Sequence, residues 1–151
     1  MILTIVRFAL GTHQCGVAVT SVREILRIVA VTRLPEAPHF LEGVIDLRGV
    51  LLPVVDLRKR FGLSPGPYDS ETRILVSELR GKPAGLIVDE VTEVAPIGPE
   101  HMGIDLSDSL GFELRSVDRV VQVDERIVIV LDLDKVLTPE EFQHLGTAGT
   151  R

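Results

Sequence analysis

Two aspartates in the stretch 42–61 are the residues whose type and spacing come closest to a catalytic pair. Asp46 precedes a predicted turn, and Asp56 ends the β run that follows it. Two such carboxylates could divide the roles of general acid and general base. No histidine, lysine or nucleophile accompanies them at a spacing typical of a catalytic site. An enzyme built on this pair would need a deep polar pocket that also holds His39.

The rest of the sequence predicts no catalysis, no cofactor and no metal. The four histidines are scattered and form no ligand pattern with the single cysteine, Cys15. The sequence contains no phosphate-binding glycine loop, no serine-hydrolase elbow and no zinc-protease motif. We therefore expect Cys15 to be a small core residue in a reducing compartment.

A structural role explains Asp56 better than a catalytic one. Asp56 and Asp132 each follow a β run and precede a leucine and basic residues. A carboxylate in that place accepts a backbone N–H two or three residues on and caps a short helix. Because the arrangement occurs twice, we interpret both aspartates as helix caps.

The turn at Arg48 and Gly49 is harder to explain by scaffold needs alone. Gly43 and Gly49 lie in strand surroundings and indicate a bulge or tight turn with unusual backbone angles. Asp124 occupies the position of Arg48 in the second half of the chain, so a basic residue there is not a requirement of the shared fold. We expect Arg48 to pair with Glu24, which we place in a short helical turn over Thr20–Ile25.

Strand signals dominate the elements that must position these residues. Short β runs separated by glycine and proline turns follow one another along most of the chain. Val22, Ile25 and Ile28 recur three residues apart, with Val91, Val94 and Ile97 as counterparts. Most of these side chains are expected in the core, and two such stripes could also form a groove for an apolar helix face.

The chain contains an internal repeat. Residues 16–28 align with 85–97, and 43–61 align with 119–137, without gaps and in the same order. The segment 64–71 separates the two copies as a linker. We therefore expect one domain over 1–145 that contains two similar subdomains, 1–63 and 72–137. The two subdomains could exchange strands. Residues 146–151 are expected to form a flexible tail.

Composition excludes several classes of partner. Acidic residues outnumber basic ones, 22 to 16, for a formal charge of −6, and binding to a nucleic-acid backbone relies on lysine and arginine. A nucleic-acid-binding barrel would need a local basic face. No apolar run is long enough for a membrane span, and the N-terminus lacks the pattern of a signal peptide. These features predict a cytoplasmic protein that neither binds nucleic acid nor inserts into the membrane.

The motifs resemble those of the CheW-like family of chemotaxis coupling proteins. The family pattern has an apolar V-x-E-I segment, a proline-spaced connector, and G-V-x-N-L-R-G followed by P-V-x-D-L. In this chain these are 22–25, 34–38 and 43–57, and the likeness covers about 3–142. One departure is Asp46, where the family usually has asparagine, which adds a charge to the turn.

The resemblance implies a mostly β fold of two small SH3-like five-stranded barrels, packed together with a few short helices. It implies an adaptor without catalysis that bridges the cytoplasmic tip of methyl-accepting chemoreceptors and the regulatory domain of a CheA-type histidine kinase. Such a protein is cytoplasmic and recruited to membrane-associated receptor arrays. A relative that serves another signalling array is the alternative.

The resemblance also implies a receptor-binding groove with a supporting ion pair. Carried over by position, its residues are Val22, Ile25, Ile28, Gly43, Arg48 and Gly49, with Glu24 holding Arg48.

Overall fold

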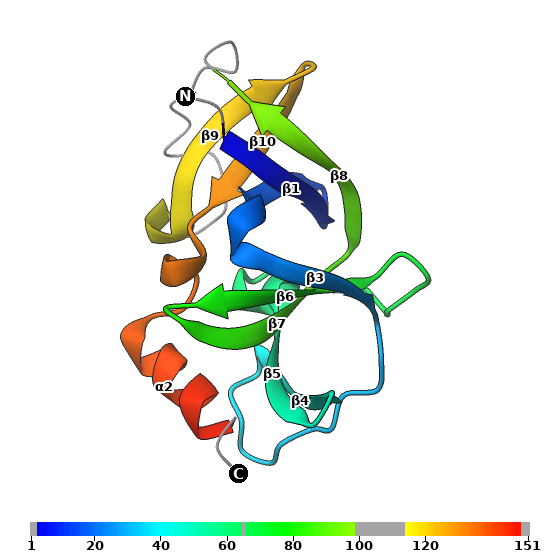
Figure 1. The fold of residues 1–151 in the computed structure, drawn as a ribbon, viewed down its shortest axis with the longest axis vertical. Helices are drawn as coiled ribbons and strands as arrows, with labels where there is room; N and C mark the ends of the chain where they lie inside the picture. Colours follow the sequence, from blue (N-terminus) through cyan, green and yellow to red (C-terminus); the bar gives the residue numbers. More distant parts are fainter. Residues whose placement is uncertain (1–2, 65, 99–113, 149–151) are drawn as a thin grey trace.

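The computed structural model describes residues 3–64, 66–98 and 114–148, and these ranges are mostly β-strand (Figure 1). The strands are β1 (Leu3–Leu10), β2 (His13–Ala18), β3 (Val22–Arg27), β4 (Leu41–Leu47), β5 (Val50–Asp56), β6 (Arg73–Leu79), β7 (Lys82–Val88), β8 (Glu90–Ile97), β9 (Val117–Val123) and β10 (Arg126–Leu131). The helices are the 3-10 turns η1 (Val19–Ser21), η2 (Leu114–Ser116) and η3 (Leu133–Lys135), and the α-helices α1 (Leu57–Arg60) and α2 (Pro139–Ala148).

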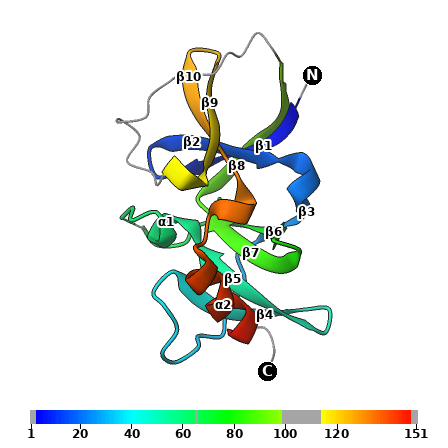
Figure 2. The ribbon, with the colours of Figure 1, turned by 90° about the vertical axis from the view of Figure 1, so that its left-hand side faces the viewer.

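The strands form two five-stranded sheets that both halves of the chain build together. The first sheet has the order β8-β1-β2-β10-β9, and the second has the order β3-β6-β7-β5-β4. Each sheet contains one parallel pair, β2 with β10 and β5 with β7, among antiparallel neighbours. Figures 1 and 2 show the two sheets stacked along the long axis, with α2 beside the second sheet.

The two sheets follow one plan down to their irregularities. A β-bulge at Arg23 in β3 has its counterpart at Thr92 in β8, and a bulge at Glu42 in β4 has its counterpart at Asp118 in β9. A bulge adds one residue to a strand and turns the following side chains to the other face. The repeat therefore preserves which side chains face inward as well as the strand order.

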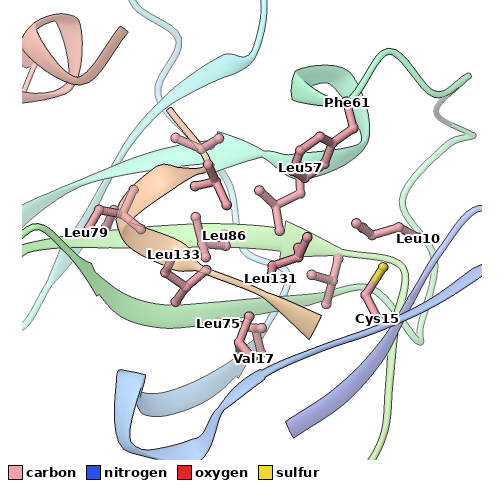
Figure 3. Close-up of a cluster of buried hydrophobic side chains, with 14 of the residues drawn as sticks. Leu10, Cys15, Val17, Leu57, Phe61, Leu75, Leu79, Leu86, Leu131 and Leu133 are labelled. Carbon is pink, nitrogen blue, oxygen red and sulfur yellow. The ribbon is translucent and has the colours of Figure 1, made fainter. Parts of the chain in front are cut away.

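Three apolar clusters hold these layers together. The largest lies between the sheets and draws on both, and its buried members include Leu10, Leu57, Leu75, Leu86 and Leu131 (Figure 3). We call each sheet together with its own smaller cluster a unit. Ile5 and Val128 belong to the smaller cluster of the first unit, and Leu52 and Ile74 to that of the second. Because both sheets contribute to the largest cluster, the two units share one core.

The fold class is confirmed, with one correction to the predicted barrels. The units are SH3-like five-stranded sheets, but no pairing in the described residues joins β8 to β9 or β3 to β4. Each unit is therefore a curved sheet with two edge strands, and closure would require a further ladder of backbone hydrogen bonds.

The predicted helical turn over Thr20–Ile25 is wrong in its second part. Only the 3-10 turn η1 is helical, and Val22 begins the strand β3, which pairs with β6. The spacing was ambiguous because the bulge at Arg23 puts Val22 and Ile25 on one face of a strand, as a helical turn would.

The C-terminal helix reaches further than expected. Thr138 accepts a hydrogen bond from the backbone N–H of Glu141, whose side chain accepts one from the backbone N–H of Thr138. This capping box begins α2, which ends at Ala148. The helix thus includes three residues of the expected tail, and 149–151 lie outside the described residues.

Candidate functional site

The tip of the β4–β5 hairpin carries the first part of the candidate site. Arg48 and Gly49 both have positive φ, 51° and 87°, the geometry of a type I′ turn. The Asp46 carboxylate accepts the backbone N–H of Gly49 at 2.8 Å and stabilises this turn. The carboxylate thus does what the usual asparagine oxygen can also do at this position.

The structure brings Arg48 and Glu24 together. The Arg48 guanidinium donates to the Glu24 carboxylate, although the two residues lie on the hairpin tip and on the edge strand β3. The Arg48 side chain is 70% exposed and that of Glu24 33% exposed, so the pair adds little stability and remains available to a partner.

A surface hollow of about 310 Å³ lies around this ion pair. Both charged and apolar side chains line it, so it can receive a partner that offers both kinds of group. Its lining residues are Arg23, Glu24, Leu47, Arg48, Val50, Leu52, Val76 and Pro83.

An apolar seam between the edge strands β3 and β8 forms the second part of the site. Cross-strand neighbours share a face of a sheet, and Ile25 stands opposite Leu75, a member of the central core. Val22 lies on the same face of β3 and packs against that core. Ile25 is 41% exposed, so this edge presents apolar surface where the sheets meet.

The repeat places a matching pair on β8. Val91 stands opposite Phe8 and Val94 opposite Val6, and both partners belong to the central core. Val91 packs against this core, whereas Val94 is 56% exposed. We use the name seam groove for the four apolar residues Val22, Ile25, Val91 and Val94, which lie along the edge strands β3 and β8.

Two of the predicted groove residues lie elsewhere. Ile28 packs against the cluster inside the second unit, on the opposite face from Ile25. Gly43 is buried in β4 with φ at 147°, and a Cβ there would lie 1.9 Å from the carbonyl oxygen of Thr32. The segment at Thr32 pairs with Val44 through two backbone hydrogen bonds of 2.9 Å, so Gly43 makes room for this crossing.

The structure does not bring together Asp46, Asp56 and His39, the three residues that an enzyme would require in one pocket. Asp46 is exposed on the hairpin and Asp56 is fully buried, and they line different hollows. His39 lines neither of these hollows. Among the described residues, Asp46 and Asp56 therefore lie in separate hollows rather than in one that could hold a common substrate.

Both predicted caps lie at the starts of short helices. Asp56 accepts the backbone N–H of Arg58 at 2.9 Å, and Asp132 accepts that of Asp134 at 3.0 Å. Asp56 has a second partner, because the Arg58 guanidinium donates to both of its carboxylate oxygens at 3.0–3.1 Å. Burial would lower the pKa of Arg58, but the hydrogen bonds and charges of Asp56 and Asp89 outweigh it and raise this pKa.

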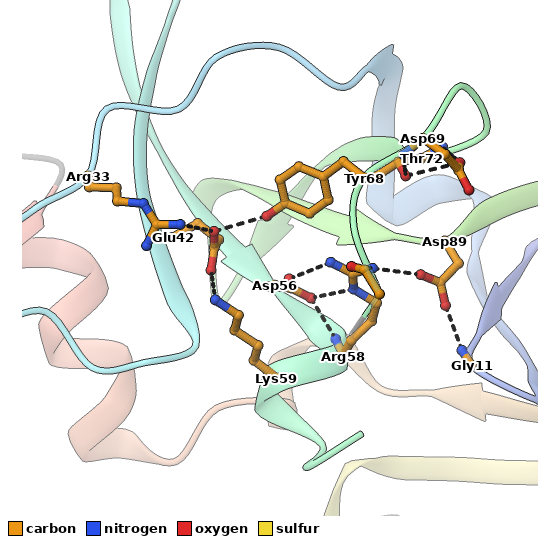
Figure 4. Close-up of polar contacts among 11 residues, drawn as sticks. Gly11, Arg33, Glu42, Asp56, Arg58, Lys59, Tyr68, Asp69, Thr72 and Asp89 are labelled. Atoms are coloured by element: carbon orange, nitrogen blue, oxygen red, sulfur yellow. Dashed lines mark hydrogen bonds and ion pairs between the residues drawn. The ribbon is translucent and has the colours of Figure 1, made fainter. Parts of the chain in front are cut away.

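A second buried carboxylate, Glu42, was missed by the sequence reasoning. Lys59 and the Tyr68 hydroxyl donate to its two oxygens, and Arg33 lies 3.7 Å away (Figure 4). Burial would raise the pKa of Glu42, but the bonds from Lys59 and Tyr68 and the nearby positive charges lower it overall. Burial and then the bond to Glu42 raise the pKa of Tyr68.

This polar network lines a hollow of about 340 Å³, and its donors and acceptors form hydrogen bonds and ion pairs with one another. The position of Glu42 at a bulge, before Gly43, was the only signal that could have marked it in the sequence.

In the described part of the chain, no three His, Cys, Asp or Glu side chains converge to hold a metal ion. No helix among the described residues is long and apolar enough to cross a membrane.

Comparison with known proteins agrees with this architecture. The model of the CheW-like domain matches residues 4–141. The chemotaxis protein CheW of Klebsiella aerogenes is 31% identical over 135 residues, covering 89% of this chain and 81% of its own. The CheW of Bacillus subtilis is 30% identical over 141 residues, covering 90% and 87%.

A solved structure has a similar fold. The crystal structure of the scaffolding protein TtCheW from Thermoanaerobacter tengcongensis superposes with a TM-score of 0.84 at 33% identity, covering 93% of this chain and 91% of the other. Two SH3-like five-stranded sheets that share one core define a domain of the CheW-like type. The chain belongs to the CheW-like family of chemotaxis scaffold proteins.

Proposed function

We propose that this protein couples chemoreceptors to a CheA-type histidine kinase by binding both, without catalysis of its own. The observation that supports this most directly is the exposure of Ile25 and Val94 on the two edge strands, together with the Arg48–Glu24 ion pair, whose Glu24 precedes Ile25 in β3. An apolar groove flanked by charges suits the amphipathic face of a helix. The partner for this groove is the helical cytoplasmic tip of a methyl-accepting chemoreceptor.

The receptor contacts in this proposal are Val22, Ile25 and Arg48, with Val91 and Val94 completing the groove. Gly49 and Glu24 shape and hold the hairpin tip next to it. Ile28 and Gly43 support the contact from inside, since each is packed within the second unit.

The kinase partner in this proposal is the regulatory domain of the CheA-type kinase. The family resemblance supports this partner, because it implies a kinase domain with the same paired-sheet plan that docks unit to unit. Recruitment to a cytoplasmic receptor array then follows from binding two partners at once, since tethering raises the effective concentration of the second.

Co-sedimentation with a receptor cytoplasmic fragment and the kinase from the same genome tests the proposal. We expect Arg48→Asp to weaken receptor binding about tenfold, typical of losing an arginine at the centre of an interface, while the circular dichroism spectrum stays unchanged. Arg119→Asp is the matched control, because Arg119 is a 52% exposed arginine on the other unit. Full kinase activation in arrays of the Arg48→Asp protein would contradict the proposed contact.

A charge exchange tests the supporting pair. We expect Glu24→Arg with Arg48→Glu to recover part of the binding that each single reversal loses, because the exchange restores an ion pair that positions the hairpin tip. Absence of any recovery in the double variant would remove Glu24 from the proposed site.

A further inference from the structure

Between β7 and β8 the chain passes from the second sheet back to the first through one residue, Asp89. Strand β7 of the second sheet ends at Val88, and strand β8 of the first sheet begins at Glu90. The place of β8 is fixed along its length by its pairing with β1 and at its start by the contacts of Asp89. Since β8 carries Val91 and Val94, the contacts of Asp89 lie next to one side of the seam groove.

Polar contacts hold Asp89 from both units at once. One carboxylate oxygen accepts from the Arg58 guanidinium at 3.0 Å, and the other accepts the backbone N–H of Gly11 at 2.6 Å. The Asp89 backbone N–H donates to the carbonyl of Ala9 at 3.0 Å. Arg58 follows β5 of the second sheet, whereas Gly11 and Ala9 belong to the β1–β2 hairpin of the first (Figure 4). We call Arg58, Asp89 and Gly11 the junction clamp.

The Arg58 side of the clamp is rigid. Its side chain is only 4% exposed, and the fully buried Asp56 holds it by two side-chain bonds. A guanidinium fixed in this way presents its remaining N–H groups in a set direction. Asp89 therefore meets a donor whose position is determined before the contact forms.

The second copy of the repeat contains a similar contact at the equivalent turn, although its carboxylate, Asp134, aligns with Arg58 and not with Asp89. Arg80 lies in the β6–β7 turn, at the position equivalent to Gly11, and its backbone N–H donates to the Asp134 carboxylate at 2.7 Å. Its side chain also donates to the Asp134 carbonyl at 2.9 Å. Asp134 follows β10 of the first sheet, so this contact too crosses between the units. Each central hairpin is thus held to the opposite unit by a carboxylate.

We propose that Asp89 is a positioning residue that sets the spacing of the seam groove by holding the start of β8 to both units. Loss of its carboxylate frees the first residues of β8 and changes where Val91 and Val94 lie relative to Val22 and Ile25. Its effect on receptor binding rests on the proposed function, whereas its effect on geometry does not.

Distances between spin labels on the two units measure this geometry without any partner. Leu51→Cys and Ile127→Cys place labels at equivalent exposed sites, one on each unit, with the native side chains 39% and 43% exposed. Cys15 is fully buried and so escapes labelling in the native protein. We expect one narrow distance distribution for the parent, a broadened or shifted one for Asp89→Ala, and a smaller change for Asp89→Asn, which retains an acceptor for Gly11.

Glu90→Ala is the matched control, because it removes an exposed carboxylate one residue away. An unchanged distribution in folded Asp89→Ala overturns the proposal, as does an equal change in Glu90→Ala. If Asp89→Ala does not fold, Asp89→Asn decides by the same criterion.

Titration with the unlabelled receptor fragment provides the second readout. We expect Asp89→Ala to raise the dissociation constant about fivefold or more, with the Arg48–Glu24 pair intact. A changed distance distribution with unchanged receptor affinity overturns the positioning role. If the parent itself does not bind the fragment, the proposed function fails, and the distance measurement still decides whether Asp89 sets the geometry.

Discussion

Gly43→Ala allows the sharpest test of how the structure assigns roles to the two glycines of the β4–β5 hairpin. A Cβ at residue 43 would lie 1.9 Å from the carbonyl oxygen of Thr32, and φ at this residue is 147°. The Thr32 segment would have to move away, which breaks its two backbone hydrogen bonds to Val44. Gly49 also has a positive φ, but no atom lies within 4 Å of its Cβ position.

The magnitude follows from these contacts. Two backbone hydrogen bonds contribute about 1 kcal/mol each, and the disallowed backbone angle costs about 1–3 kcal/mol. Gly43→Ala should therefore lower the free energy of unfolding by about 3–5 kcal/mol. Gly49→Ala should cost only about 1–2 kcal/mol, because strain in the left-handed region is its only penalty.

Urea denaturation followed by circular dichroism measures both free energies. A shift of the midpoint at constant slope would report a change in stability of the native state. Equal losses for the two variants, or a loss below about 1 kcal/mol for Gly43→Ala, would refute the argument that the Thr32 crossing requires glycine.

Three further predictions concern buried groups. Asp56→Ala should cost about 3–5 kcal/mol of stability, because it leaves Arg58 buried without its main partner. Asp132→Ala should cost only about 1 kcal/mol, because it removes a half-exposed helix cap. Similar losses for the two variants in urea denaturation would contradict this difference. The native pKa of Glu42 lies below its ordinary 4.5, so its stabilising effect is complete above that pH and disappears as the pH falls; the melting temperature of Glu42→Gln should fall less steeply below that pH than that of the parent, and parallel curves would refute it. Burial raises the pKa of the Cys15 thiol to about 12, so a thiol reagent at pH 8 should label it only in denaturant, and rapid native labelling would contradict its burial.

The β4–β5 hairpin illustrates how far sequence reasoning reaches. The tight turn at Arg48 and Gly49 was predictable because turn residues act through their own backbone angles, which depend on local sequence. The N–H acceptors Asp56 and Asp132 were predictable for the same reason, since a cap bonds a backbone group two residues away. The Arg48–Glu24 pair was proposed from charge and repeat position, although the element assigned to Glu24 was incorrect.

The face of a strand on which each side chain lies was harder to predict than the strands themselves. Val22, Ile25 and Ile28 recur at equal spacing, yet Ile28 lies on a different face from the other two. A bulge at Arg23 reverses the alternation of the strand, and bulges depend on pairing with a partner strand as well as on the bulged residue. The open edges of the two sheets were missed for a related reason, because closure depends on ladders between strands distant in sequence.

The sequence by itself determined the repeat, the turn chemistry, the helix caps and the family, because each of these is written in residues close together along the chain. Only the tertiary structure decided how the halves exchange strands, and it alone showed that Arg58 and Asp89 meet where the chain crosses between the sheets. Those residues are far apart in sequence, and neither belongs to a pattern that specifies the other. Their contact arises because the parallel pairing of β5 with β7 brings the end of β5, before Arg58, beside the end of β7, before Asp89. Both strands contribute side chains to the shared core, so this pairing depends on the whole fold.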